Sequence, residues 1–265
     1  MRDVWRVFGT YIAAVVVILV TSGVAILTLK SAFPDTPDQV LLQSLPGLLA
    51  GILASSFALL FTLLVIVQPA TPAALRLAPG WETDRTLVVM ILGMLALGQT
   101  LDSLTWLAGL ADRGSLVFVR RVLEGAVGPE LFAAVLVLGV VAGIAEELFF
   151  RGYMQTRLAQ SWSRTRAVVV TAVCFGMLHF DLSGVHVVHA FAVGLYLGFV
   201  VEHTGSVLPA IACHIVNNVL YTLQVAFRLT IHDRATNAVV ALACVLLFAL
   251  CLAWLRRMAP PPATA

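Results

Sequence analysis

Long apolar stretches constrain this chain more than any other feature. About 20 apolar residues suffice for a helix to cross the hydrocarbon core of a bilayer. The candidate spans are residues 7–29, 41–67, 86–110, 130–157, 167–180, 185–203, 207–227 and 235–254, of which the fifth is short. Because 60% of the 265 residues are hydrophobic and only 11% are charged, a soluble domain is excluded. The sequence predicts an all-α fold, a polytopic bundle of about eight transmembrane helices.

Charge and cysteine content narrow the possible partners and cofactors. The formal net charge is +2, and no basic run interleaves with aromatic residues, so nucleic acid is not expected as a partner and the lipid bilayer is. The cysteines are read as small apolar packing residues rather than disulfide or metal-site residues. They are Cys174, Cys213, Cys244 and Cys251.

The chain divides into three parts on this pattern. Residues 1–129 hold N-terminal transmembrane helices and a segment, 111–129, that we expect on the membrane surface. Residues 130–222 form the core that carries the candidate site, and residues 223–265 add a last transmembrane helix and a short, proline-rich tail expected to be disordered.

The charge distribution predicts an orientation. An even number of crossings puts both termini on one side, and roughly ten Lys and Arg residues against six favour cytoplasmic termini. The first span reads as a retained helix rather than a signal peptide. We expect a multi-pass protein of a bacterial inner membrane.

Two carboxylates and a guanidinium interrupt the fourth span. A charged side chain at the bilayer centre costs roughly 2.5 to 3.5 kcal/mol, so such residues usually mark a site. Glu147 and Arg151 are four apart and share a helix face, which predicts an ion pair, whereas Glu146 points about 100° away and is left to act on a proton. The alternative is an interfacial cluster of charges without function. Asp102 is a second intramembrane candidate, or an interfacial residue.

Other spans contribute imidazole and amide groups. His179 ends the fifth span, and His214 and Asn218 share a face of the seventh, which Asn217 does not. A glutamate with a histidine can deprotonate water, and a second histidine with an amide can stabilise the oxyanion that forms when water attacks a carbonyl. The alternative is that these histidines only pack between helices. The constellation predicts an amide hydrolase.

The spacing of these residues resembles a known family, the CPBP intramembrane proteases, which include CAAX prenyl endopeptidases and bacteriocin-processing or immunity proteins. The resemblance covers about residues 130–222. Its motifs are EExxxR at 146–151, FxxxH at 175–179 and HxxxN at 214–218, with a glycine-bearing helix at 191–198 and a turn at 204–206.

The resemblance implies a membrane-embedded endopeptidase. No serine or cysteine stands out as a nucleophile, so we expect direct attack by water without an acyl-enzyme. Glu146 and His179 would activate water, His214 and Asn218 would form the oxyanion hole, and Glu147 with Arg151 would stabilise the site. The substrate would be a membrane-anchored protein or peptide: a prenylated chain, a bacteriocin leader or a sorting helix.

A metal ion is an open alternative. The family has been described both as metal-dependent and as glutamate-dependent, and a zinc ion, if present, would be bound by Glu146, His179 and His214. The extra histidines His186 and His189 are three apart on one face and could also bind zinc with Glu146 or His179, or could only form hydrogen bonds near the interface.

Two rival functions come from other classes. Intramembrane acids and histidines also serve proton-coupled transporters, although the two matching halves that many transporters have are not visible in the sequence. A non-catalytic immunity or scaffold protein could use the same fold to bind a peptide.

Overall fold

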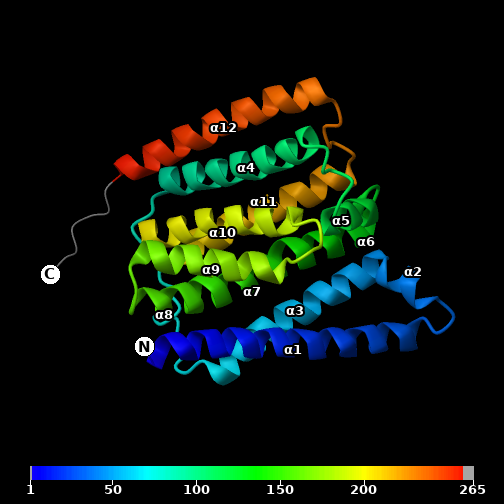
Figure 1. Cartoon of the computed structure of the whole chain (residues 1–265), viewed down its shortest axis with the longest axis horizontal. Coiled ribbons are helices and arrows are strands. Elements are labelled where there is room, and N and C mark those ends of the chain that lie inside the picture. Colours follow the sequence, from blue (N-terminus) through cyan, green and yellow to red (C-terminus); the bar gives the residue numbers. More distant parts are fainter. Residues whose placement is uncertain (1, 259–265) are drawn as a thin grey trace.

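The computed structural model describes residues 2–258, and the proline-rich tail predicted to be disordered lies outside them. The described residues form helices joined by loops, without strands (Figure 1). The helices are α1 (Arg2–Ala32), α2 (Asp38–Leu42), α3 (Leu45–Ile66), α4 (Asp84–Leu107), α5 (Ser115–Leu123), α6 (Gly128–Ala134), α7 (Ala142–Glu147), α8 (Thr156–Ala159), α9 (Arg164–Leu178), α10 (Val185–Thr204), α11 (Leu208–Ala226) and α12 (Arg234–Arg257), with π-helical segments η1 (Val135–Val141) and η2 (Leu148–Gln155). The predicted all-α bundle is confirmed.

Seven helical segments within 2–258 are long and apolar enough to span a membrane. The eighth predicted span is α9, which has only 15 residues. It nevertheless lies among the spanning helices, and α1 begins at the end of the bundle where α12 finishes (Figure 1). The chain is therefore a multi-pass integral membrane protein.

The second span starts later than predicted. Residues 38–42 form the separate helix α2, and α3 begins only at Leu45. The Ser44 side chain caps α3 by accepting a hydrogen bond from the Gly47 backbone N–H at 3.2 Å, and Pro46 lies in the first turn. A capping serine followed by proline favours a helix start here over a continuous run.

The fourth span is one continuous helical segment, Gly128–Ala159. Within it, η1 and η2 flank the short α-helix α7, which ends with Glu146 and Glu147. Turns of π-helix are rare and occur often at functional sites. The apolar pattern of the sequence did not predict them.

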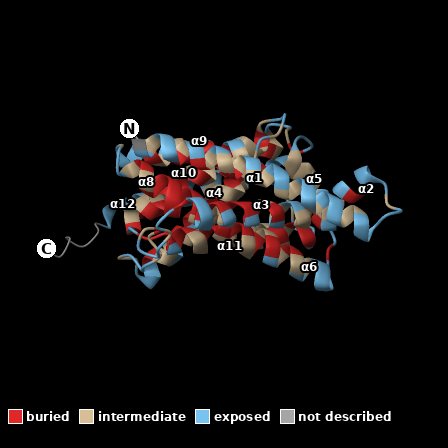
Figure 2. Cartoon of the chain, turned by 90° about the horizontal axis from the view of Figure 1, so that it is seen from below, coloured by how far each residue is buried: buried red, intermediate tan, exposed pale blue. Residues whose placement is uncertain are grey.

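The bundle is layered around this segment. Helices α4 and α12 pack together on one side and α1 and α3 on the other, while α9, α10 and α11 lie between them beside Gly128–Ala159 (Figure 1). Buried residues concentrate on the central elements and exposed ones on the outer faces (Figure 2). The outward faces carry large apolar side chains such as Leu27, Phe57 and Leu250, as expected for lipid contact.

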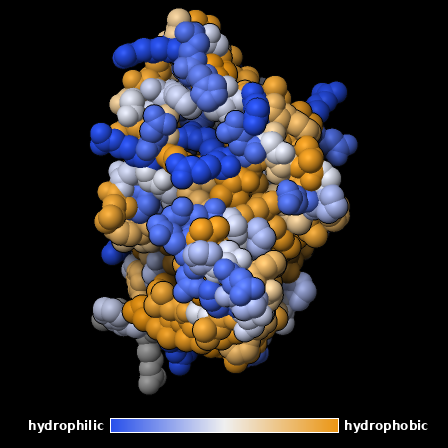
Figure 3. Space-filling model, turned by 90° about the vertical axis from the view of Figure 1, so that its right-hand side faces the viewer, coloured by the Kyte–Doolittle hydropathy of each residue, from blue (hydrophilic) through white to orange (hydrophobic). Residues whose placement is uncertain are grey.

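The segment predicted to lie on the membrane surface contains α5, which packs across α3, α10 and α11. Figure 3 looks onto this end of the bundle and shows hydrophilic side chains gathered between apolar ones. The end of the bundle that carries α5 therefore has a mixed surface, with polar side chains among apolar ones.

Candidate active site

A buried acid lies between a guanidinium and an imidazole at the centre of the bundle. Arg151 on η2 donates from Nη1 to Oε1 of Glu147 at 2.8 Å, and Nδ1 of His214 on α11 lies 2.9 Å from the same oxygen. Glu147 and Arg151 are fully buried and His214 is 4% exposed. The predicted Glu147–Arg151 pair is therefore present, is enclosed by the protein, and includes His214.

The guanidinium has further contacts that compensate for its burial. Arg151 donates from Nη2 to the Gly194 carbonyl of α10 at 3.3 Å, and its charge lies 4.5 Å from the centre of the Phe175 ring. A cation over an aromatic face is stabilised most when both are removed from water. Among residues 2–258, Oε2 of Glu147 and Nε of Arg151 have no hydrogen-bond partner, so the hydrogen bonds of the buried pair leave one oxygen and one nitrogen unused.

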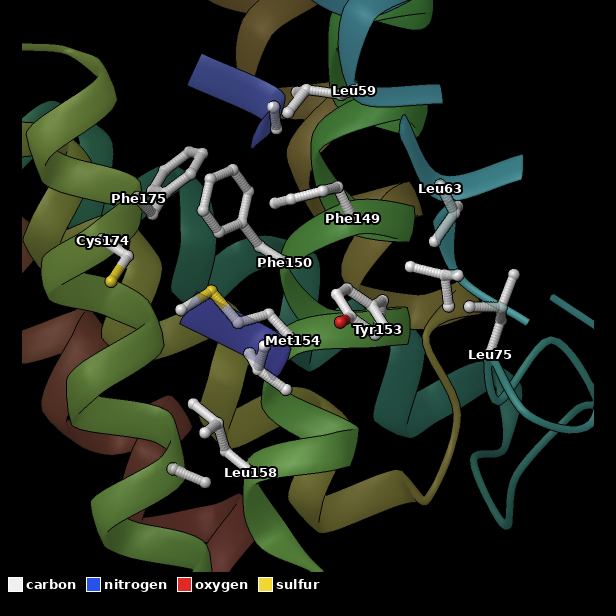
Figure 4. Packing of buried hydrophobic residues seen from close by; sticks show 14 of the residues in the cluster. Leu59, Leu63, Leu75, Phe149, Phe150, Tyr153, Met154, Leu158, Cys174 and Phe175 are labelled. Carbon is white, nitrogen blue, oxygen red and sulfur yellow. The ribbon is translucent and has the colours of Figure 1, made fainter. Parts of the chain in front are cut away.

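Apolar packing fixes the π-helical segment that carries Arg151. Phe149, Phe150 and Met154 of η2 are fully buried, and they pack with Tyr153 and with Phe175 of α9 (Figure 4). Large interdigitated side chains leave little freedom for rotation. The position of the guanidinium is therefore set by the surrounding core.

Glu146 is the more accessible acid of the pair. Its side chain is 18% exposed, and its Oε2 lies 3.7 Å from Nε2 of His214. This separation is too long for a direct hydrogen bond, and it suits a bridging water or substrate oxygen. His214 thus turns one nitrogen to each glutamate.

His179 follows the last residue of α9. Its Nδ1 lies 2.9 Å from the Phe175 carbonyl oxygen, which can only accept, so Nδ1 carries the hydrogen and Nε2 of the neutral ring is left as an acceptor. The rings of His179 and His214 both pack against Phe175, with centroids 4.7 and 6.1 Å from it. Phe175 therefore joins the two histidines of the predicted site.

Asn218 is anchored to the π-helical segment η1. It donates from Nδ2 to the Leu138 carbonyl at 3.1 Å and accepts from Nδ2 of Asn217 at 3.3 Å. Its second N–H is not used by these bonds. Asn218 is one turn from His214 on α11, as its spacing predicts.

Glycines allow α11 to approach the acid-bearing segment. A Cβ added at Gly139 would lie 2.5 Å from Val219, and one added at Gly143 would lie 3.1 Å from Ile215. Small residues are the usual means by which membrane helices pack closely. The close crossing brings His214 to Glu147.

The structure adds one contact that the sequence did not predict, between Nδ1 of His214 and Glu147. The oxyanion role of His214 with Asn218 stays a prediction. Sequence analysis also missed the roles of Phe175 and of the Gly194 carbonyl. For the Gly194 carbonyl, the signal in the sequence was the glycine-bearing stretch 191–198.

The alternative zinc cluster at the sixth span is not assembled. Nδ1 of His186 lies 2.8 Å from the Ser115 hydroxyl, and Nε2 of His189 lies 2.8 Å from that of Thr105. Residues 2–258 contain no group of three or more His, Cys, Asp or Glu side chains arranged to hold a metal ion. Zinc binding by Glu146, His179 and His214 stays a prediction for metal analysis.

Two aspartates outside the site have structural partners. Asp102, near the end of α4, lies 3.6 Å from Nη1 of Arg120. Asp181 lies in the turn after His179, where partial burial raises its pKa but hydrogen bonds from Ser183 and Ser115 lower it more, leaving the pKa well below its usual range. Asp181 is therefore a carboxylate at neutral pH.

Comparison with known proteins agrees with this geometry. Residues 128–220, which hold all three motifs, match the family described as Rce1-like, type II CAAX prenyl endopeptidase Rce1-like. No curated protein and no solved structure matches the chain significantly. Over residues 128–220, the chain is therefore similar to the CAAX-type intramembrane proteases.

Proposed function

We propose that the chain is an intramembrane endopeptidase that hydrolyses a peptide bond of a membrane-associated protein or peptide with a water molecule activated by Glu146. The observation that supports this most directly is the 3.7 Å separation between Oε2 of Glu146 and Nε2 of His214. A reacting oxygen that lies beside the line joining these two atoms can be within hydrogen-bond distance of both the acid and an imidazole that Glu147 holds in place.

Glu146 serves as general base and then as general acid. Its carboxylate takes a proton from water as the water oxygen bonds to the scissile carbonyl carbon. It returns that proton to the amide nitrogen as the carbon–nitrogen bond breaks, which releases an amine and a carboxylic acid. His179, whose Nε2 is free to accept, is our candidate for a second acceptor of a hydrogen of this water.

Asn218 and His214 stabilise the oxyanion of the tetrahedral intermediate. The second N–H of Asn218 and, in the protonated ring, the Nε2–H of His214 are donors held before the substrate arrives. Glu147 and Arg151 orient His214 through Nδ1. The water-derived oxygen remains in the acid product, so no covalent enzyme intermediate forms.

The substrate class follows from the surroundings and the family. A site in the core of a multi-pass bundle is reached by a chain that is itself held at the membrane, and the matching family is described as a prenyl endopeptidase. A lipid-anchored peptide is therefore our first candidate, ahead of a leader or sorting helix. The alternative functions, a scaffold and a transporter, predict binding or transport without cleavage.

The membrane placement is also part of the proposal. We place both termini in the cytoplasm of a bacterium and the connection 108–114 on the opposite side of the inner membrane. Single cysteines introduced at exposed positions in a variant lacking the four native cysteines would be labelled by an impermeant maleimide in intact cells at 108–114 only. Labelling at 160–163 instead would show that the orientation is the opposite of the one we propose.

Cleavage in a purified system tests the function. Protein reconstituted in liposomes should cut a membrane-anchored fluorescent peptide, and Glu146→Gln should reduce turnover by roughly 10²- to 10⁴-fold. Glu130→Gln is the matched control, because Glu130 is an exposed acid on the same helical segment. Wild-type turnover by a correctly inserted Glu146→Gln would contradict the mechanism. Peptides with and without a prenyl group, compared side by side, test the substrate class.

A further inference from the structure

We propose that His186 is a positioning residue for His179, and that Ser115 at the start of α5 and Asp181 hold it in place. The inference rests on the proposed function, because it assigns a role relative to a catalytic His179. His186 matches none of the three motifs, and the sequence suggested for it only a metal-binding or an interfacial role.

A continuous chain of hydrogen bonds supports His186. Its Nδ1 lies 2.8 Å from the Ser115 hydroxyl oxygen. That hydroxyl lies 3.0 Å from Oδ2 of Asp181, which also accepts the Ser115 backbone N–H at 3.1 Å. The other carboxylate oxygen accepts from Ser183 at 2.5 Å. The carboxylate is thus fixed on both oxygens, and the serine is fixed twice.

The direction of these hydrogen bonds defines the state of the ring. Ser115 has one hydroxyl hydrogen, and the carboxylate can only accept it, so the serine oxygen must accept from Nδ1–H of His186. The neutral His186 ring is therefore the Nδ1–H tautomer. His179 carries its hydrogen on the same nitrogen, which it donates to the Phe175 carbonyl.

His186 and Phe175 pack their rings on His179, and we call these two rings the ring cage. The centroids of the two histidine rings are 4.7 Å apart with the planes at 65°, and Phe175 packs on His179 at the same centroid distance of 4.7 Å. Such edge-to-face pairs are favourable and directional. His179 follows the end of α9, where no further helical turn restrains it, so the His186 ring supplies the restraint on that side.

The approach of the loop before α5 is unusually close. Gly114 precedes Ser115 with φ at +78°, and a Cβ added there would lie 2.7 Å from Oδ2 of Asp181. A glycine that avoids both the backbone strain and this contact lets the serine reach the carboxylate. The surface helix α5 is thereby attached to the turn that follows His179.

His189 provides a matched control within the same helix. It lies one turn from His186 on α10, is half-buried like it, and is hydrogen-bonded to Thr105 on α4 instead. It belongs neither to the Ser115–Asp181 chain nor to the ring cage. Loss of His189 should therefore leave turnover within about twofold, while loss of His186 should not.

The test is steady-state cleavage by full-length protein in liposomes. We expect His186→Ala to lower kcat by roughly 10- to 100-fold with KM nearly unchanged, because small displacements of a catalytic group cost rate. His186→Phe, which keeps a ring against His179, should recover part of that loss. Ser115→Ala should lower kcat, and Ser115→Thr, which keeps the hydroxyl, should restore it.

Coupling between the variants distinguishes positioning from general structural damage. If Ser115 acts through His186, Ser115→Ala should have no further effect on kcat in the His186→Ala background. Independent, multiplicative losses, or wild-type kcat in His186→Ala, would overturn the inference. Glu146→Gln in the same assay separates the two proposals: if it is inactive while His186→Ala is normal, only this inference fails.

Discussion

Nδ1 of His214 lies 2.9 Å from Oε1 of Glu147, so the acid that was expected only to hold an arginine also orients an imidazole. Glu147 thus connects Arg151 to His214, and Nε2 of His214 faces Glu146. The two adjacent glutamates therefore have different tasks although they stand side by side in the sequence. Glu147 is buried and fixed, and Glu146 is more exposed and faces Nε2 of His214.

Removing the charge of Glu147 should damage both stability and activity. Glu147→Gln leaves the guanidinium of Arg151 buried without a counter-charge, which costs about 3 to 5 kcal/mol in the free energy of unfolding. Thermal unfolding in detergent and turnover in liposomes should both fall. A stable, active Glu147→Gln would contradict the assigned pair.

Replacing the whole pair should separate stability from activity. Arg151→Met alone leaves Glu147 charged in an apolar site, whereas Glu147→Leu together with Arg151→Met removes both charges and fills similar volume. We expect the double variant to regain much of the lost unfolding free energy and yet to stay inactive, because His214 has lost its partner. Measuring melting temperature and turnover on one preparation checks both parts.

Close packing at Gly194 should not tolerate a methyl group. A Cβ there would lie 3.1 Å from that of Ala172 and 3.3 Å from Nη2 of Arg151, so Gly194→Ala should destabilise by about 1 to 3 kcal/mol through overpacking. Gly51→Ala is the control, because nothing lies within 4 Å of its added Cβ. Equal melting temperatures for the two variants would show that α10 does not press on the arginine.

The amide of Asn218 should matter to the rate more than that of its neighbour. Loss of one oxyanion donor typically costs roughly 10²- to 10³-fold in kcat, and we expect this for Asn218→Ala with KM little changed. Asn217→Ala removes only a donor to Asn218 and should cost less than about tenfold. The reverse ranking would assign the oxyanion contact to Asn217.

Features encoded within one segment were predictable. The apolar runs define the helices, and the four-residue spacing of Glu147 and Arg151 alone predicts their ion pair. The break before Leu45 was missed, although Ser44 and Pro46 carry its signal, because hydropathy does not register a helix cap.

Features that depend on helix crossings were not predictable. The contact between His214 and Glu147 arises because Gly139 and Gly143 let α11 approach. The local sequence around these glycines does not indicate which helix packs against them. Likewise, His186 and His189 share a face, but their partners Ser115 and Thr105 come from distant segments, which separates two histidines that spacing alone would group.

The π-helical turns on either side of α7 have a genetic consequence. A π-helical turn contains more residues than an α-helical turn. The direction in which Glu146 and Glu147 point around the helix axis therefore depends on the number of residues in η1. Deletion of one codon in η1, such as that of Val137, would leave a segment long and apolar enough to insert into the membrane. It would also rotate both glutamates away from His214. Insertion or deletion of one residue in this segment should therefore abolish activity while the protein still inserts into the membrane.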